Sequence, residues 1–191
     1  MDTITQLVTI AAVVLGGLTT YLTNSLMERS RRKDGLRLRW DEKKLDAYAD
    51  YVGQVRTTIH ISVLLYEVRE EIRQMPRTEH ELSMELTEAG GDQAKAFERV
   101  MLLAGDEVIE AAHAIQETLA AIGWQARGMV DGTLADWRAL HTEAFKAINR
   151  FHEAARADLG VGGRFEGDRH TARGLLLPGA RTAGESTDRA S

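Results

Sequence analysis

The sequence has no cysteine, only two prolines among its 191 residues, and few aromatic side chains. Without cysteine the chain forms no disulfide bond and no thiolate metal site. The shortage of proline, together with abundant Ala, Glu, Arg and Leu and few strand-like runs, favours an all-α fold. The sequence also lacks a phosphate-binding Gly-rich loop, a nucleophile elbow and a helix-borne zinc motif. We therefore predict no catalytic residue, no cofactor and no metal site.

What the sequence does contain is an uncharged N-terminal run between Asp2 and Glu28. Its 25 residues would extend about 37 Å as a helix, somewhat more than the hydrocarbon core of a bilayer. We predict a transmembrane helix within residues 1–27. A cleaved signal peptide is the competing interpretation. It would need a basic start and a small-residue cleavage site, whereas Asp2 stands at the start and residues 19–21 are Thr-Thr-Tyr.

Basic residues follow the predicted span, and none precedes it. Because Lys and Arg near the ends of a span remain on the cytoplasmic side, we predict a single-pass protein of the cell (inner) membrane. Its N-terminus would lie outside the cell, and the chain from Glu28 onward would be cytoplasmic. We expect the cations to contact anionic lipid headgroups, the alternative being that they only fix the topology. These cations are Arg29, Arg31, Arg32, Lys33, Arg37 and Arg39.

The net charge of −5 hides a division along the chain. Residues 28–44, the predicted basic juxtamembrane segment, carry eight basic and four acidic side chains. Residues 45–159 carry eleven basic and twenty acidic side chains. Because an acidic body repels nucleic-acid backbones, nucleic acid is not an expected partner. The expected partners are the lipid bilayer, a second copy of the chain and an unidentified cytoplasmic protein.

Small residues within the predicted span stand at a spacing that permits helix packing. Ala12 and Gly16 are four residues apart, a pattern that lets two spans approach closely. This spacing predicts self-association through the span. The alternative is that the small residues only tolerate contact with lipid.

Residues 34–75 contain no proline and are predicted to form one long helix that Pro76 ends. Apolar residues at 3-4 spacing form one stripe and a second stripe opens beside it, so the helix should pack against two partners, as in a coiled coil. The first stripe is Leu38, Leu45, Tyr48, Val52, Val55, Ile59, Ser62 and Tyr66. The second stripe is Ile61, Leu65, Val68, Ile72 and Met75.

The next stretch is predicted to be two short helices. Thr78 and Glu81 form a capping box that starts the first of them. We interpret residues 90–92, Gly-Gly-Asp, as a break in which Asp92 caps a new piece that ends at Ala104. The inward residues of that piece should be Phe97, Met101 and Leu102.

Two further helices complete the predicted bundle. Gly105-Asp106 has the form of a stop followed by a cap, and the helix after it should end near Arg127. Thr133 and Asp136 resemble a capping box for a last helix that ends at Gly160. The apolar stripes are Val108, Ala112, Ile115, Leu119, Ile122 and Ala126, then Leu134, Trp137, Ala144, Ile148, Phe151 and Ala155. We therefore predict an antiparallel helical bundle over residues 45–159 and a disordered tail over residues 160–191.

Several side chains suggest chemistry but have simpler interpretations. Glu110-x-x-His113 is half of a carboxylate-bridged di-metal motif, yet no other histidine has a glutamate three residues before it, so we interpret the pair as a surface pair. His141 lies on the apolar stripe of the last helix and should be a core-edge histidine hydrogen-bonded to a neighbour. The three tryptophans are interpreted as packing residues: Trp40, Trp124 and Trp137.

A few positions resemble a known group of proteins. They are Arg39-Trp40-Asp41, Lys44-Leu45, Tyr48-x-x-Tyr51 and the ending Ala154-Ala155-Arg156-x-x-Leu159-Gly160. The layout is similar to a loosely defined group of bacterial single-span membrane proteins with a helical cytoplasmic domain, some of which look like plasmid transfer and spread proteins. The resemblance implies an architecture and carries no catalytic residue onto this chain.

Our leading functional hypothesis is a membrane-tethered cytoplasmic helical scaffold without catalytic activity. One alternative is a mobile-element factor, encoded by a phage or plasmid, that perturbs the envelope or assists DNA transfer. Another is an anchored enzyme or ligand sensor with a pocket between the long helix and the last one. Convergence of His60, Glu67 and His141 in one enclosed cavity would favour that second alternative.

Overall fold

The computed structural model describes residues 21, 27, 39–163 and 165. This part of the chain is all-α, with four helices and no strand, as the composition predicts. The first helix covers 39–69. It is followed by α2 (Glu79–Leu103), α3 (Asp106–Ala126) and α4 (Leu134–Asp158). The chain divides into two compact units, Met1–Asp46 and Ala47–Ser191, and the second contains the helical bundle.

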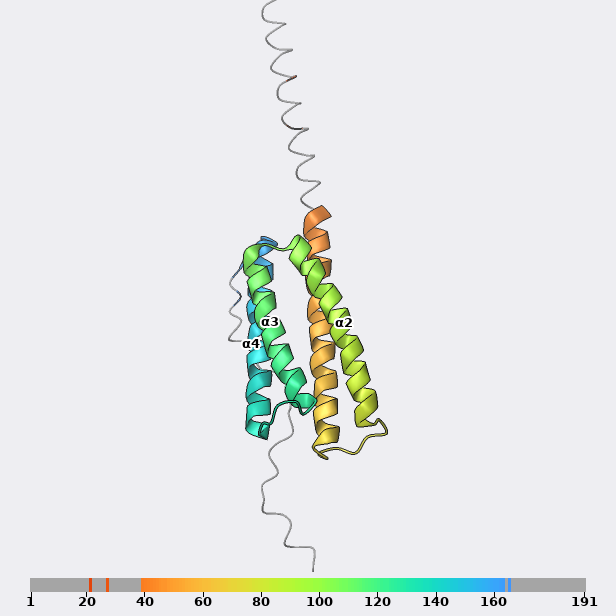
Figure 1. Cartoon of the computed structure of the whole chain (residues 1–191). Coiled ribbons are helices and arrows are strands. Elements are labelled where there is room, and N and C mark those ends of the chain that lie inside the picture. Colours follow the sequence, from red (N-terminus) through yellow and green to blue (C-terminus); the bar gives the residue numbers. More distant parts are fainter. Residues whose placement is uncertain (1–20, 22–26, 28–38, 164, 166–191) are drawn as a thin grey trace, which may run out of the picture. The chain divides into compact units, whose positions relative to one another are not determined.

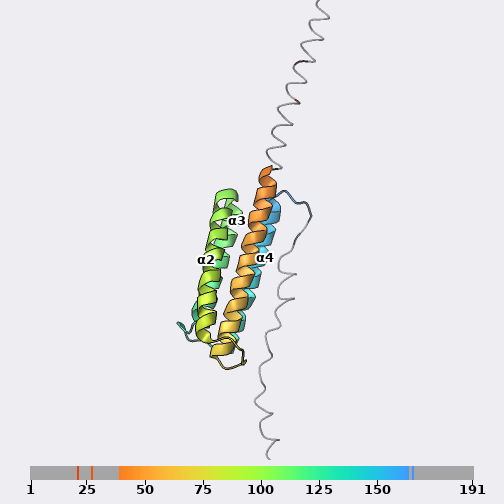
Figure 2. The ribbon, with the colours of Figure 1, turned by 90° about the vertical axis from the view of Figure 1, so that its right-hand side faces the viewer.

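Within the second unit each helix runs antiparallel to the one before it (Figures 1 and 2). Ring contacts at both ends of the bundle fix this arrangement. Tyr48, near the start of the first helix, meets Phe151 near the end of α4, with ring centroids 5.7 Å apart. Tyr66, near the end of the first helix, stacks on Trp137 at the start of α4, at 4.1 Å. The predicted antiparallel bundle is thereby confirmed.

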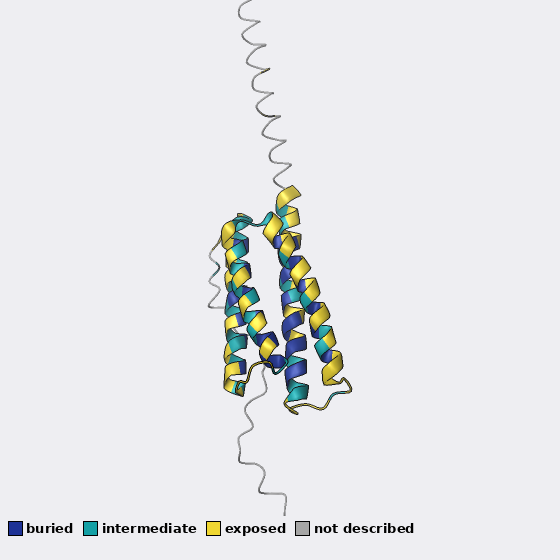
Figure 3. Cartoon of the chain, in the orientation of Figure 1, coloured by how far each residue is buried: buried dark blue, intermediate teal, exposed yellow. Residues whose placement is uncertain are grey.

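Tyr51 lies in the middle of the core and contacts all three of the other helices. Its ring packs against Phe97 of α2 at 6.0 Å and against Phe151 of α4 at 5.3 Å. Its hydroxyl donates a hydrogen bond of 3.1 Å to the backbone carbonyl of Ala112 in α3. The predicted stripe of α3 is buried at every position, and the buried surfaces of the helices face one another (Figure 3).

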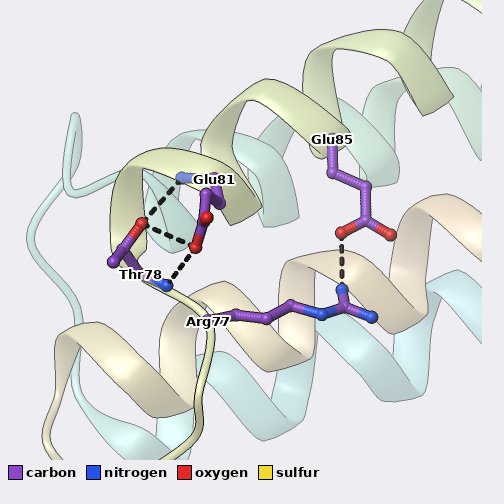
Figure 4. A network of polar contacts seen from close by, with 4 residues as sticks. All are labelled: Arg77, Thr78, Glu81 and Glu85. Carbon is purple, nitrogen blue, oxygen red and sulfur yellow. Dashed lines mark hydrogen bonds and ion pairs between the residues drawn. The ribbon is translucent and has the colours of Figure 1, made fainter.

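Both predicted capping boxes are present. Thr78 accepts a hydrogen bond from the Glu81 backbone N–H, while its own N–H donates to the Glu81 carboxylate at 2.8 Å (Figure 4). Thr133 and Asp136 make the same reciprocal pair at the start of α4, again with a 2.8 Å bond to the carboxylate. Each box satisfies backbone donors that the first turn of a helix leaves unpaired, so it fixes where the helix begins.

The predicted break at residues 90–92 is wrong, because α2 is one continuous helix. Its buried positions keep a 3-4 spacing straight through the two glycines: Leu82, Leu86, Ala89, Gln93, Ala96 and Val100. Packing along this stripe outweighs the weak helix propensity of glycine. The inward positions predicted near its end are also wrong in part, since Leu102 is 82% exposed and Met101 is exposed too, whereas Phe97 is partly buried.

The first helix ends at residue 69, six residues before the predicted end at Met75. Two hydrogen bonds close its last turn, from the Ile72 N–H to the Glu67 carbonyl and from the Glu71 N–H to the Val68 carbonyl. This is a Schellman arrangement with Glu71 in the left-handed region at φ 53°. The backbone therefore turns away before Pro76, and Ile72 is exposed instead of lying on the second stripe.

Other local predictions need correction. Leu45 is 56% exposed, so the first stripe is buried only from Tyr48 onward among the described residues. The N-cap of α3 is Gly105, and Asp106 is already the first helical residue. Of the three tryptophans, only Trp137 packs in the core.

Candidate functional site

The predicted membrane-surface cations and span-packing pair fall outside the described residues, with one exception. They are Ala12, Gly16, Arg29, Arg31, Arg32, Lys33 and Arg37. Arg39 is described, lies in the first helix and is exposed. Within the described part, no helix combines the length and the apolar character needed to cross a bilayer. The transmembrane helix, the topology and the lipid contacts stay predictions.

The three polar side chains that would have marked an enclosed catalytic cavity do not come together. His60 is exposed on the first helix. Glu67 pairs with Arg73 at 3.3 Å, between its own carboxylate and the guanidinium. His141 is fully buried in α4. The pocket imagined between the first helix and α4 is instead filled by the stacked rings of Tyr66 and Trp137.

His141 has a structural environment. Its Nδ1 lies 2.8 Å from the Trp137 backbone carbonyl, so Nδ1 carries the proton and donates. Burial lowers the pKa of His141, and the carbonyl contact only partly opposes this. Its Nε2 is buried and has no hydrogen-bond partner in the described part of the chain. The predicted histidine at the core, bonded to a neighbour, is confirmed, with the bond made to the backbone.

Glu110 and His113 are both exposed on α3, as a surface pair would be. The His113 ring meets the edge of Phe97 at a centroid distance of 5.1 Å, which gives it a packing contact across the α2–α3 boundary. Over residues 39–163, no three His, Cys, Asp or Glu side chains group closely enough to hold a metal ion.

The tyrosines of the first helix use their hydroxyls to join helices. Tyr48 donates a 2.7 Å hydrogen bond to the Asp158 carboxylate at the end of α4. Burial raises the pKa of Tyr48, and the adjacent carboxylate raises it further. Burial likewise raises the pKa of Tyr51, which the amide of Gln93 partly opposes. Both phenols therefore remain protonated donors at neutral pH. Their three-residue spacing places them on one face of the helix, but only the fold reveals their partners.

A turn after α3 displays large apolar side chains. Trp124 is 52% exposed, Met129 69% and Val130 52%. The turn is closed by two backbone hydrogen bonds, from the Met129 N–H to the Trp124 carbonyl and from the Gly128 N–H to the Gln125 carbonyl. These are the two bonds of a Schellman motif, which brings the residues at its two ends together. The turn is therefore ordered although its side chains face solvent.

Arg69 of the first helix fixes this turn from the side. Its Nη1 donates a 3.1 Å hydrogen bond to the Gln125 carbonyl. The guanidinium lies directly against Gly128, whose φ is +68°, and a Cβ at that position would overlap it. Glycine is thus required both for the backbone conformation and for the approach of Arg69. Sequence reasoning located the turn through Gly128 but missed Arg69 and the display of Met129 and Val130.

Comparison with protein-family models, with curated proteins and with solved structures finds no match to this chain.

Proposed function

We propose that the protein is a membrane-tethered helical interaction protein of the cytoplasmic face, which acts by contacting another protein and performs no chemistry itself. The observation that carries the proposal is the ordered turn that exposes Trp124, Met129 and Val130. Large apolar side chains that remain half exposed on a rigid frame are typical of protein contact surfaces. We call Trp124, Met129 and Val130 the contact turn.

The order of the contact turn favours binding. A surface that is already held in shape loses little conformational freedom when a partner binds. Here the backbone bonds of the turn and the Arg69 guanidinium supply that order before any partner arrives. Trp and Met are also enriched in the buried centres of interfaces, where few residues provide most of the binding energy.

The location of the contact turn also supports the proposal. Within the second unit it lies at the end of the bundle opposite residue 47 (Figure 1). The first helix rises about 33 Å between residues 47 and 69. The bundle therefore acts as a spacer between the point where the chain enters the unit and the contact turn.

The polar groups buried in the bundle have structural tasks. Thr58 and Ser62 donate to carbonyls of their own helix, at 3.0 and 2.8 Å. Tyr51 and His141 bond the backbone carbonyls of Ala112 and Trp137. None of these four side chains is paired with a base or a nucleophile in the described residues, which favours a contact function over catalysis.

The contact proposal is tested by photo-cross-linking in intact cells, with a photoreactive residue at position 129 of the full chain. We expect a discrete cross-linked product that disappears when Trp124→Ser is added. A product of twice the chain mass identifies a second copy, and any other discrete mass identifies a different protein. Glu117, exposed in the middle of α3, is the control position and should give no such product. An equal product at 117, or none at 129, would contradict the proposal.

The tether is tested separately. The full chain should sediment with membranes, and protease added outside intact cells should leave the bundle uncut. Release into the soluble fraction, or external cleavage after residue 47, would contradict the predicted span and topology while leaving the contact turn to be judged on its cross-links.

A further inference from the structure

A groove of about 200 Å³ opens between α2 and α3, over Thr58 of the first helix. It exists because α3 packs closely along α4 but touches α2 at few places. Its lining includes Leu86, Gly90 and Gln93 from α2 and Leu119, Gly123 and Arg127 from α3.

The size and length of the groove together indicate the shape of an occupant. A cavity of 150 Å³ admits benzene, so about 200 Å³ admits about eight heavy atoms. The lining on α2 runs from Leu86 to Gln93, a helix rise of about 10 Å. An extended chain of eight carbon atoms is about 9 Å long, whereas a ring of that many atoms is much shorter. The groove therefore fits one unbranched chain better than a ring system.

Gly90 keeps the groove open. A Cβ at residue 90 would meet no atom within 4 Å, so the neighbouring helices do not require a glycine there. Glycine inside a helix is destabilising relative to alanine, and here no positive φ or close packing compensates for it. Its effect is to leave empty the space that a larger side chain would occupy.

The ends of the groove differ in chemistry. Arg127 is the sole charged residue of the lining, and no carboxylate of the described residues lies within ion-pair distance of it. Its guanidinium folds back toward the Gly123 carbonyl, 3.4 Å away. At the other end the Gln93 side chain is only 5% exposed, and its Nε2 is buried without a hydrogen-bond partner. Leu86 and Leu119 supply an apolar middle.

We propose that this groove binds one medium-chain carboxylate of about eight carbons. The carboxylate pairs with Arg127, and the alkyl chain lies along Leu119 and Leu86 over the open face of Gly90. The cation favours an acid over an alcohol or an amine, because a charge-assisted pair is stronger than a neutral hydrogen bond. The amides of Gln93 and Gln116 limit the chain length, because a longer chain would cover polar groups without bonding them. This site is separate from the proposed protein contact and does not depend on it.

The test uses the full chain held in an amphipathic polymer and titrated with [1-¹³C]octanoate, whose carboxyl signal is followed by NMR. We expect saturable binding at one site. Gly90→Leu, which fills the groove, should weaken binding at least tenfold. Gly91→Leu is the matched control: it changes the next residue of the same helix in the same way, but Gly91 is exposed and outside the groove, so binding should be unchanged. Arg127→Gln should weaken binding roughly tenfold.

Further arms make the result decisive. Circular dichroism checks that Gly90→Leu is folded, and Ala120→Leu, which enters the groove from α3, should weaken binding in the same way. Octanol should bind at least tenfold more weakly than octanoate, and hexadecanoate should bind more weakly than octanoate. Unsaturable binding, or equal binding by the wild type and both groove-filling variants, would show partition into the polymer and overturn the site. Octanol that binds as well as octanoate would overturn the recognition of a carboxylate.

Discussion

Replacing the two glycines in the middle of α2 with alanine tests the central departure of the structure from its local sequence signals. In the structure Gly90 and Gly91 are interior helical residues, and neither has a positive φ. A Cβ at either position would meet no atom within 4 Å. Alanine should therefore contribute its helix propensity in full and introduce no clash.

The expected magnitude follows from helix propensity. Glycine in a helix interior is less favourable than alanine by about 1 kcal/mol, so each substitution should raise the free energy of unfolding by about that amount. The double variant should gain about 2 kcal/mol, because neither new methyl group has a neighbour through which the two could couple. For a bundle of this size, about 1 kcal/mol corresponds to a rise of about 4 °C in Tm.

The assay is urea unfolding of the full chain, followed by tryptophan fluorescence, to which the buried Trp137 contributes. The midpoint should rise while the slope stays constant, since the same surface is exposed on unfolding. Gly128→Ala is the opposing control and should destabilise, because its φ of +68° and the Arg69 guanidinium both disfavour a side chain. If alanine at 90 or 91 lowered stability, the continuous α2 would be refuted in favour of a turn.

Three further substitutions test individual contacts. Glu71→Gly should stabilise by about 0.5–1 kcal/mol in urea unfolding by relieving a non-glycine left-handed residue, whereas Glu70→Gly, one residue earlier, should destabilise; equal effects would contradict the helix end at Glu71. Tyr51→Phe should destabilise by about 1–2 kcal/mol because it leaves a buried carbonyl without its donor, and no loss in urea unfolding would contradict that bond. Burial lowers the pKa of His141, so the unfolded chain takes up a proton below pH 6.5 that the folded chain does not, and stability should fall by up to about 1.4 kcal/mol per pH unit as the pH drops. His141→Leu should flatten that slope in urea midpoints measured from pH 7.5 to 5, leaving the smaller contribution of His152; an unchanged slope would contradict it.

Short-range signals predicted much of the bundle. The capping residues Thr78 and Thr133 mark the starts of two helices because the bonds that define them reach only three residues along the chain. Gly160, with a φ of +66°, marks the end of α4 for a similarly local reason. The stripe of α3 was predictable because each of its positions is apolar.

The sequence misled where a local preference and the packing disagree. The stripe of α2 passes through Gln93, whose polar side chain interrupts the apolar pattern at the point where two glycines suggest a turn. Only the neighbouring helices reveal that the register continues. Similarly, nothing about Glu71 predicts a left-handed residue, because the conformation is imposed by the helix end and the chain that follows. The contact of Arg69 with the turn at Gly128 joins positions far apart in sequence and could not be predicted at all.

These failures are not spread evenly over the molecule. Gly90 and Gln93, which concealed the continuity of α2, both line the groove between α2 and α3. A helix selected only for stability would place alanine at the first position and an apolar residue at the second, since the Gln93 amide nitrogen is buried without a partner. Residues that weaken their own helix and surround one cavity are more simply explained by what the cavity holds than by the packing of the bundle. The same two positions therefore link the misleading stretch of sequence to the proposed carboxylate site.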